Sequence, residues 1–175
     1  MIRVAHTAEL DAATLAAARE LLAESFEGGF GDEDWEHALG GLHALAFDGN
    51  RLVAQGAVVQ RRLIHAGRAL RAGYVEAVAV APPDRRRGHA SALMHALEGV
   101  IRRAYDLGAL SATDDGATLY GARGWLPWRG PTSALTPTGT VRTPEDDDAV
   151  FVLPGAASLD PGGALTCDWR DGDLW

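Results

Sequence analysis

The chain has 175 residues, an apolar fraction of 47% and a formal net charge of −8, and this length fits one domain with a full hydrophobic core. The acidic balance argues against a general nucleic-acid binder and favours a cationic partner. Cys167 is the only cysteine, which excludes an intrachain disulfide and is compatible with a reducing compartment. There is no signal-peptide core and no apolar run of membrane-spanning length, so we expect a cytoplasmic protein without a membrane partner.

The first forty residues predict a short strand at 2–5 and two helices. Capping residues at 7–11 precede a helix over 13–26, and its inward-facing residues are expected to be Leu15, Leu21, Leu22 and Phe26. The glycine-rich acidic stretch at 27–32 predicts a loop. Residues 32–37 then predict a second short helix, whose N-terminal acids suit the helix dipole.

Three strands follow in the prediction, at 43–48, 52–63 and 69–80, and the turn signals Gly49-Asn50 and Ala66-Gly67 favour an antiparallel meander. The remaining elements are a long helix at 88–107, a short strand at 110–111, a short helix at 117–122, a strand that begins at 125–128, and a last clear strand at 149–153. Residues 154–175 form a tail rich in glycine and aspartate. We find no internal repeat and expect residues 1–175 to form a single domain.

The stretch 74–97 predicts a strand, a tight basic loop and a helix. Val75, Val78 and Val80 favour a buried strand, which Pro82-Pro83 ends because proline cannot donate to a sheet ladder. Small residues in Arg85-x-x-Gly88-x-Ala90 let the backbone approach a ligand closely. The free N–H groups at the helix start suit a phosphate, and the adjacent arginines add charge for a diphosphate.

This stretch resembles the acetyl-CoA loop of the GNAT N-acetyltransferase superfamily, in which a Val-x-Val strand (here Val78-Ala79-Val80) precedes Arg-x-x-Gly-x-Gly/Ala. A solvated turn is the alternative for the loop alone, and the downstream segment 119–125 argues against it. The resemblance implies an α/β (α+β) GNAT fold, with a central, mixed but mostly antiparallel sheet flanked by helices, and acetyl-CoA as co-substrate. It places the coenzyme A contacts at Val78, Val80, Arg85, Arg86, Arg87, Gly88, His89 and Ala90.

Two side chains are candidates for proton transfer during amide formation. In strict alternation Glu76 shares a face of its strand with Tyr74, Val78 and Val80. An unpaired carboxylate there is costly, so Glu76 is either a general base or a partner in a salt bridge. The segment around Tyr120 resembles the superfamily helix whose phenol faces the coenzyme A sulfur, which makes Tyr120 the candidate acid, with half-buried packing as its alternative.

A closer resemblance covers nearly the whole chain in order and is to the aminoglycoside 2′-N-acetyltransferases of actinobacteria. It is carried by residues 34–37, 39–41, 60–64, 73–76, 108–111, 124–128, 130–133, 151–154 and 167–170. It implies transfer of an acetyl group from acetyl-CoA to the 2′-amine of an aminoglycoside, by direct attack of the amine on the thioester. It also implies that the enzyme confers antibiotic resistance and forms a homodimer. It makes Glu76 the base, through water, and Tyr120 the acid, and it places substrate contacts at Asp34, Glu76, Ser111, Asp146, Asp173 and the Trp175 carboxylate.

Two departures from that family's pattern stand out. Gly29 precedes Phe30 where the family has an aspartate, and Glu27 could substitute for it. The loop glycine lies at the general superfamily position rather than in an Arg-Gly-Gln run. Two alternatives stay open: an N-acetyltransferase for another small polyamine, and a non-catalytic binding module. No His/Cys/Asp spacing predicts a metal site.

Overall fold

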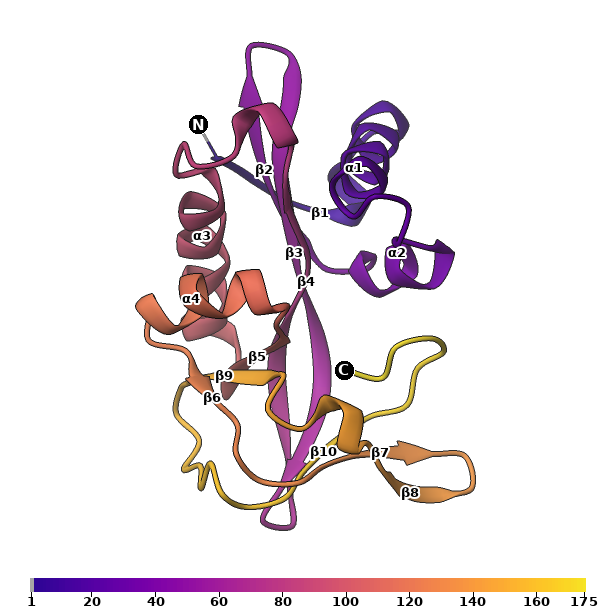
Figure 1. The fold of residues 1–175 in the computed structure, drawn as a ribbon, viewed down its shortest axis with the longest axis vertical. Coiled ribbons are helices and arrows are strands. Elements are labelled where there is room, and N and C mark those ends of the chain that lie inside the picture. Colours follow the sequence, from indigo (N-terminus) through magenta and orange to yellow (C-terminus); the bar gives the residue numbers. More distant parts are fainter. Residues whose placement is uncertain (1) are drawn as a thin grey trace. The chain divides into compact units, whose positions relative to one another are not determined.

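The computed structural model describes residues 2–175, and the chain divides into two compact units. The first unit comprises Met1–Val59 and Val75–Val100, and the second comprises Gln60–Tyr74 and Ile101–Trp175. Strands β3 (Arg51–His65) and β4 (Arg68–Val80) each contribute residues to both units (Figure 1).

The first unit contains an antiparallel run of strands, as expected. Strand β1 (Ile2–His6) pairs with β2 (Leu42–Asp48), and β2 pairs with the beginning of β3, so that Leu42 lies opposite Val58. The predicted turn at Gly49-Asn50 is confirmed, and Gly49 has a φ of 59°, a value that glycine adopts at little cost.

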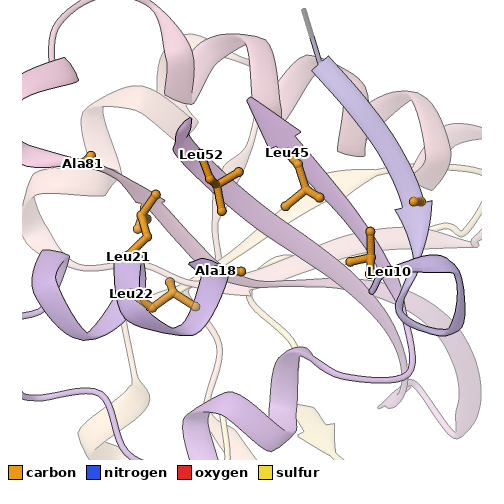
Figure 2. Close-up of a cluster of buried hydrophobic side chains, with 9 residues drawn as sticks. Leu10, Ala18, Leu21, Leu22, Leu45, Leu52 and Ala81 are labelled. Carbon is orange, nitrogen blue, oxygen red and sulfur yellow. The ribbon is translucent and has the colours of Figure 1, made fainter. Parts of the chain in front are cut away.

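Helices α1 (Ala12–Ser25) and α2 (Asp32–Ala38) also lie where the sequence predicts them. The Asp11 carboxylate caps α1 by accepting a hydrogen bond of 2.7 Å from the Thr14 N–H. Leu21 and Leu22 of α1 pack with Leu45 and Leu52 of the strands in the core cluster of Figure 2. Phe26 was expected inward, but it is 38% exposed and stacks on Phe30, because α1 ends one residue before it.

Helix α3 (His89–Ala104) buries Leu93, Leu97 and Ile101 at every fourth position, the spacing of one helix face. In the first unit it lies on the side of the strands opposite α1 (Figure 1). A Cβ on Gly56 would lie 3.1 Å from Val78 Cγ2 and 3.3 Å from Leu97 Cδ1, so glycine there allows the helix to approach the sheet. The expected extension of α3 to Leu107 is wrong.

In the second unit, Leu107 begins strand β5 (Leu107–Ser111), which pairs in parallel with β4. The unit continues with α4 (Asp114–Ala122), β6 (Leu126–Pro127) and β9 (Val150–Pro154), and β9 is antiparallel to both β5 and β6. Trp125 and Trp128 are its largest fully buried side chains.

Three strands of the second unit were not predicted. Strands β7 (Thr132–Thr136) and β8 (Gly139–Arg142) form the orange hairpin in Figure 1. Strand β10 (Leu165–Cys167) lies in the C-terminal tail, antiparallel to β3 and parallel to β7, so the expectation that the last strand ends near residue 153 is wrong. Strands of three to five residues are too short to show a clear periodic signal. The mixed, mostly antiparallel sheet is confirmed.

None of the helices in residues 2–175 combines the length and the apolar character that crossing a bilayer requires.

Candidate active site

The basic loop of the first unit has the backbone that the sequence pattern predicts. A short helix at Pro82–Asp84 follows β4, and α3 begins at His89 after Gly88, whose φ is +84°. No atom lies within 4 Å of an ideal Cβ placed on Gly88, so glycine serves here for its conformation and for the open space beside it. The N–H groups of the first helical turn have no carbonyl partner within the helix. The loop therefore fits a diphosphate at its helix start.

Asp84 organises the charges of this loop. Its side chain is 2% exposed and accepts two ion-pair hydrogen bonds of 2.7 Å, one from Arg51 and one from Arg87. The hydrogen bond from Arg51 holds the pKa of Asp84 below its ordinary value. The guanidinium of Arg87 is therefore already bound by a carboxylate of the loop. The role of Asp84 was not predicted from the sequence.

Arg85 and Arg86 differ in their surroundings. Arg85 donates to the backbone carbonyls of Val80 and Ser25, at 3.3 and 3.2 Å, and so ties the loop to the end of α1. Arg86 has a positive φ of 62° and is exposed, and within residues 2–175 its guanidinium has no hydrogen-bond or ion-pair partner. Of the three arginines, Arg86 is therefore the one available to an anionic ligand.

Strand β4 departs from strict alternation at Ala77, whose φ is +53°. Tyr74 and Val75 are both buried, while Glu76 and Val78 are half-buried. The expected alternation therefore does not continue unbroken from Glu76 to Val78. The Gln55 side chain donates to the Ala77 carbonyl at 2.9 Å. A backbone carbonyl that bonds to a side chain marks a local break in the strand, as in a bulge.

A buried polar chain continues from Gln55. The His43 Nδ1 lies 3.3 Å from Gln55 Oε1, and the His43 Nε2 lies 2.9 Å from Thr7 Oγ1. Because Gln55 Oε1 can only accept, His43 donates through Nδ1 and accepts from Thr7 when neutral. Burial lowers the pKa of His43, which favours this neutral form. Neither His43 nor Gln55 was singled out from the sequence.

The remaining candidate of the first unit is Asp34 in α2. It is half-buried, and its Oδ2 accepts a hydrogen bond of 2.7 Å from the Gly31 N–H at the start of its own helix. One carboxylate oxygen therefore has a local structural role.

Tyr120 lies in α4 of the second unit. It is 9% exposed, and its ring centroid lies 6.1 Å from that of Trp125 and 6.3 Å from that of Phe151. Burial raises the pKa of Tyr120 above its ordinary value, so the phenol stays protonated at neutral pH. A protonated phenol is the form that can act as a general acid. The pKa of the half-buried Tyr105, which directly follows α3, is also raised by burial, so a raised pKa alone does not identify Tyr120 as the acid.

Ser111 and two carboxylates, the candidate substrate contacts taken next in the second unit, have unequal environments. Ser111 ends β5 and is exposed, as is Asp173 in the tail, whereas Asp146 is half-buried. Burial raises the pKa of Asp146, and the nearby charges of Glu145, Asp173 and Asp147 raise it further. A group of carboxylates that repel one another is stabilised by a cation.

Trp175 is anchored by its indole ring. Its Nε1–H donates to Thr143 Oγ1 at 2.9 Å, and the Thr143 hydroxyl donates to Thr132 Oγ1 at 2.9 Å. The Thr132 N–H in turn donates to Asp147 at 2.9 Å. Trp175 is only 5% exposed, so the last residue of the chain is a packed element of the second unit. The pattern of the sequence gave no sign of the Thr132–Thr143 network.

Residues 2–175 contain no group of three or more His, Cys, Asp or Glu side chains that could bind a metal ion. The buried Cys167 has a pKa raised by burial to about 11, so it is not a reactive thiol.

Comparisons with known proteins agree with this geometry. The family model for an acetyltransferase (GNAT) domain matches residues 6–127. An aminoglycoside 2′-N-acetyltransferase from Mycolicibacterium fortuitum is 55% identical over 177 residues, an alignment that covers 99% of this chain and 91% of that protein.

Two solved structures share the fold. A GCN5-related N-acetyltransferase from Kribbella flavida superposes with a TM-score of 0.61 at 23% identity, over 75% of this chain but only 34% of that protein. A GNAT family acetyltransferase from Brucella melitensis in complex with acetyl-CoA superposes with a TM-score of 0.61 at 12% identity, over 94% of each chain. The loop, the fold and the match over almost its full length together assign the chain to the GNAT acetyltransferases and, among them, to the family of aminoglycoside 2′-N-acetyltransferases.

Proposed function

We propose that this enzyme transfers the acetyl group of acetyl-CoA to the 2′-amine of aminoglycosides and thereby confers resistance to them. The observation that carries the proposal is the 55% identity over 99% of the chain to an aminoglycoside 2′-N-acetyltransferase. The net charge of −8 supports a cationic substrate.

Acetyl-CoA is the acetyl donor of the family, and the loop geometry supports the contacts expected from the sequence. The N–H groups at the start of α3 and the available guanidinium of Arg86 bind the diphosphate, next to the open space at Gly88. Val78 and Val80 offer backbone groups to the pantetheine arm and the thioester. Arg85, Arg87, His89 and Ala90 shape the loop and line the bound phosphates.

The reaction needs a base for the ammonium proton and an acid for the departing sulfur. Glu76 removes the proton from the 2′-ammonium through a water molecule, and the free amine attacks the thioester carbonyl. After the attack the nitrogen loses its second proton through water to solvent, and the C–S bond breaks as the tetrahedral intermediate collapses. Tyr120 donates its proton to the thiolate and regains one from solvent. The buried, protonated phenol of Tyr120 supports this role.

The other ammonium groups of the substrate bind to the acidic candidates, which are Asp34, Asp146, Asp173 and the Trp175 carboxylate, with Ser111 as a hydroxyl partner. An ammonium–carboxylate pair is worth about 4 kcal/mol at an effective dielectric of 20 but only about 0–1 kcal/mol at an exposed rim. The half-buried Asp146, whose pKa is raised by its surroundings, is therefore the carboxylate that gains most from a cation. We further propose a cytoplasmic homodimer in which residues 1–175 act as one catalytic domain.

A steady-state assay of thiol release tests this function. Tobramycin, gentamicin, spermidine and putrescine are each offered with acetyl-CoA at equal concentration. The proposal predicts that kcat/KM is highest for the two aminoglycosides. Faster turnover of spermidine would indicate an acetyltransferase for simple polyamines, and acetyl-CoA binding without thiol release from any of these compounds would indicate a binding module.

A further inference from the structure

We propose that Arg61 and Arg170 are positioning residues, which hold the last residues of the chain in the geometry that presents their carboxylates to the cationic substrate. This inference rests on the proposed function, because it concerns the same substrate contacts. It assigns a role to two arginines that do not themselves touch the substrate.

Arg61 lies in β3 and is only 4% exposed. Its Nε donates to Asp168 Oδ1 at 2.8 Å, one terminal nitrogen donates to the Asp168 carbonyl at 2.9 Å, and the other donates to the Leu174 carbonyl at 2.7 Å. A buried guanidinium is costly unless its donors are satisfied. Here three of them bind the C-terminal tail, so the cost of burying this charge is offset only when the tail is in place.

Arg170 holds the residue before Leu174. Its Nε donates to the Asp173 carbonyl at 2.6 Å. The guanidinium carbons of Arg61 and Arg170 lie 4.8 and 5.5 Å from the centroid of the Tyr74 ring, within the range of a cation–π interaction. One buried aromatic ring of β4 therefore supports both arginines that bind the consecutive carbonyls of Asp173 and Leu174.

These contacts fix the backbone and leave the Asp173 side chain exposed. Arg170 binds the backbone carbonyl of Asp173 and not its carboxylate. Trp175, two residues further on, is held by the hydrogen bond from its indole to Thr143. The tail is thus held through the backbone carbonyls of Asp168, Asp173 and Leu174 and through the indole of Trp175. Of its carboxylates, that of Asp168 is bound by Arg61. The negative charge of Asp173 remains for an ammonium group of the substrate.

The test compares Arg61→Lys and Arg170→Ala with wild type. Lysine keeps the charge but has a single nitrogen, which cannot reach all three acceptors. We expect the Kd and KM for tobramycin to rise at least tenfold in each variant, with the Kd for acetyl-CoA and the single-turnover rate at saturating tobramycin within twofold of wild type. Arg62→Lys is the matched control, because Arg62 is exposed and its hydrogen bonds with Asp168 are made by its backbone, which a lysine retains. The Arg62 N–H donates to the Asp168 carboxylate at 3.0 Å, and the Arg62 carbonyl accepts from the Asp168 N–H at 3.1 Å.

A double-mutant cycle separates positioning from general damage. If Arg170 acts through the tail, adding Asp173→Asn to Arg170→Ala should cost less tobramycin affinity than Asp173→Asn costs in wild type. Additive losses, or an unchanged Kd for tobramycin in both arginine variants, would overturn the inference. If Arg61→Lys does not fold, Arg170→Ala decides, since that side chain is half-buried. A wild-type enzyme that binds acetyl-CoA but not tobramycin would overturn the proposed function, and with it this inference.

Discussion

The coenzyme A loop of the first unit and the C-terminal tail of the second are both candidate binding elements, but they are fixed by contacts of very different range. In the loop, Asp84 pairs with Arg87 three residues away and with Arg51 33 residues away, and Arg85 binds the Ser25 carbonyl 60 residues away. A glycine sets the turn into α3. In the tail, Arg61 reaches partners 107 and 113 residues away. The loop therefore combines local contacts with contacts of intermediate range, whereas the tail depends on a strand more than 100 residues away and can be displaced by a substitution there.

The two regions also differ in the sign of the charge that they offer to a ligand. The loop pairs most of its arginines within the protein and leaves Arg86 for an anion. The second unit brings the charges of Glu145 and Asp173 near Asp146, and burial together with these charges raises the pKa of Asp146. Each region therefore carries a charge opposite to that of the ligand proposed for it.

The largest expected effect is in the loop. Gly88→Glu introduces a negative side chain at a φ of +84° beside the proposed diphosphate, and it should abolish measurable acetyl-CoA binding in calorimetry. Gly88→Ala is the matched control: it has free space for its Cβ and carries only the backbone strain of about 1–2 kcal/mol. Normal coenzyme A affinity in the glutamate variant would remove this loop from the proposed site.

The next largest effect is expected at Tyr120, the proposed proton donor. Tyr120→Phe keeps the packing on Trp125 but removes the hydroxyl, so kcat should fall by roughly 10²–10⁴ with little change in KM. Single-turnover rates are the appropriate measurement, because product release can mask the effect. Tyr105→Phe, at a half-buried tyrosine whose pKa is also raised by burial, should retain wild-type rates, and a similar loss in both variants would mean that Tyr120 only packs.

Substrate affinity should respond more modestly. Asp34→Asn and Asp173→Asn should each raise the Kd for tobramycin about tenfold, which corresponds to about 1.4 kcal/mol, while the single-turnover rate stays close to wild type. Asparagine can still accept the hydrogen bond from Gly31 that Asp34 accepts. Asp32→Asn, whose side chain is 89% exposed, should have no effect, and an unchanged Kd in the first two variants would make them ordinary surface acids.

A pH dependence of substrate binding is the last prediction. Because the pKa of Asp146 is raised by burial and by Glu145, Asp173 and Asp147, its carboxylate is protonated at a higher pH than an ordinary aspartate. An ammonium group binds the ionised form, so the Kd for tobramycin should increase as pH falls through this pKa, by up to tenfold per pH unit. Titration calorimetry between pH 7 and pH 4.5 measures it. Asp146→Asn should flatten the curve, and an equal slope in that variant would exclude Asp146.

The same difference in contact range explains what could be predicted from the sequence. The helices, the long strands and the loop around Gly88 follow from local periodicity, turn residues and spacing. The short strand β10 and the Arg61 contacts depend on pairing with residues a hundred positions away, which no local pattern records. The break in β4 at Ala77, whose carbonyl accepts from Gln55 of the neighbouring strand, has no sign in the local sequence, so strict alternation fails beyond Glu76.

The most direct test of the central claim is the position of the acetyl group in the product. Tobramycin has a 2′-amine, whereas kanamycin A has a 2′-hydroxyl, which cannot act as an amine nucleophile. Mass spectrometry and NMR of the products should show one acetyl group on the 2′-nitrogen of tobramycin and far slower turnover of kanamycin A. Efficient acetylation of kanamycin A, or an acetyl group on the 3- or 6′-amine of tobramycin, would contradict the proposed function and leave the GNAT fold intact.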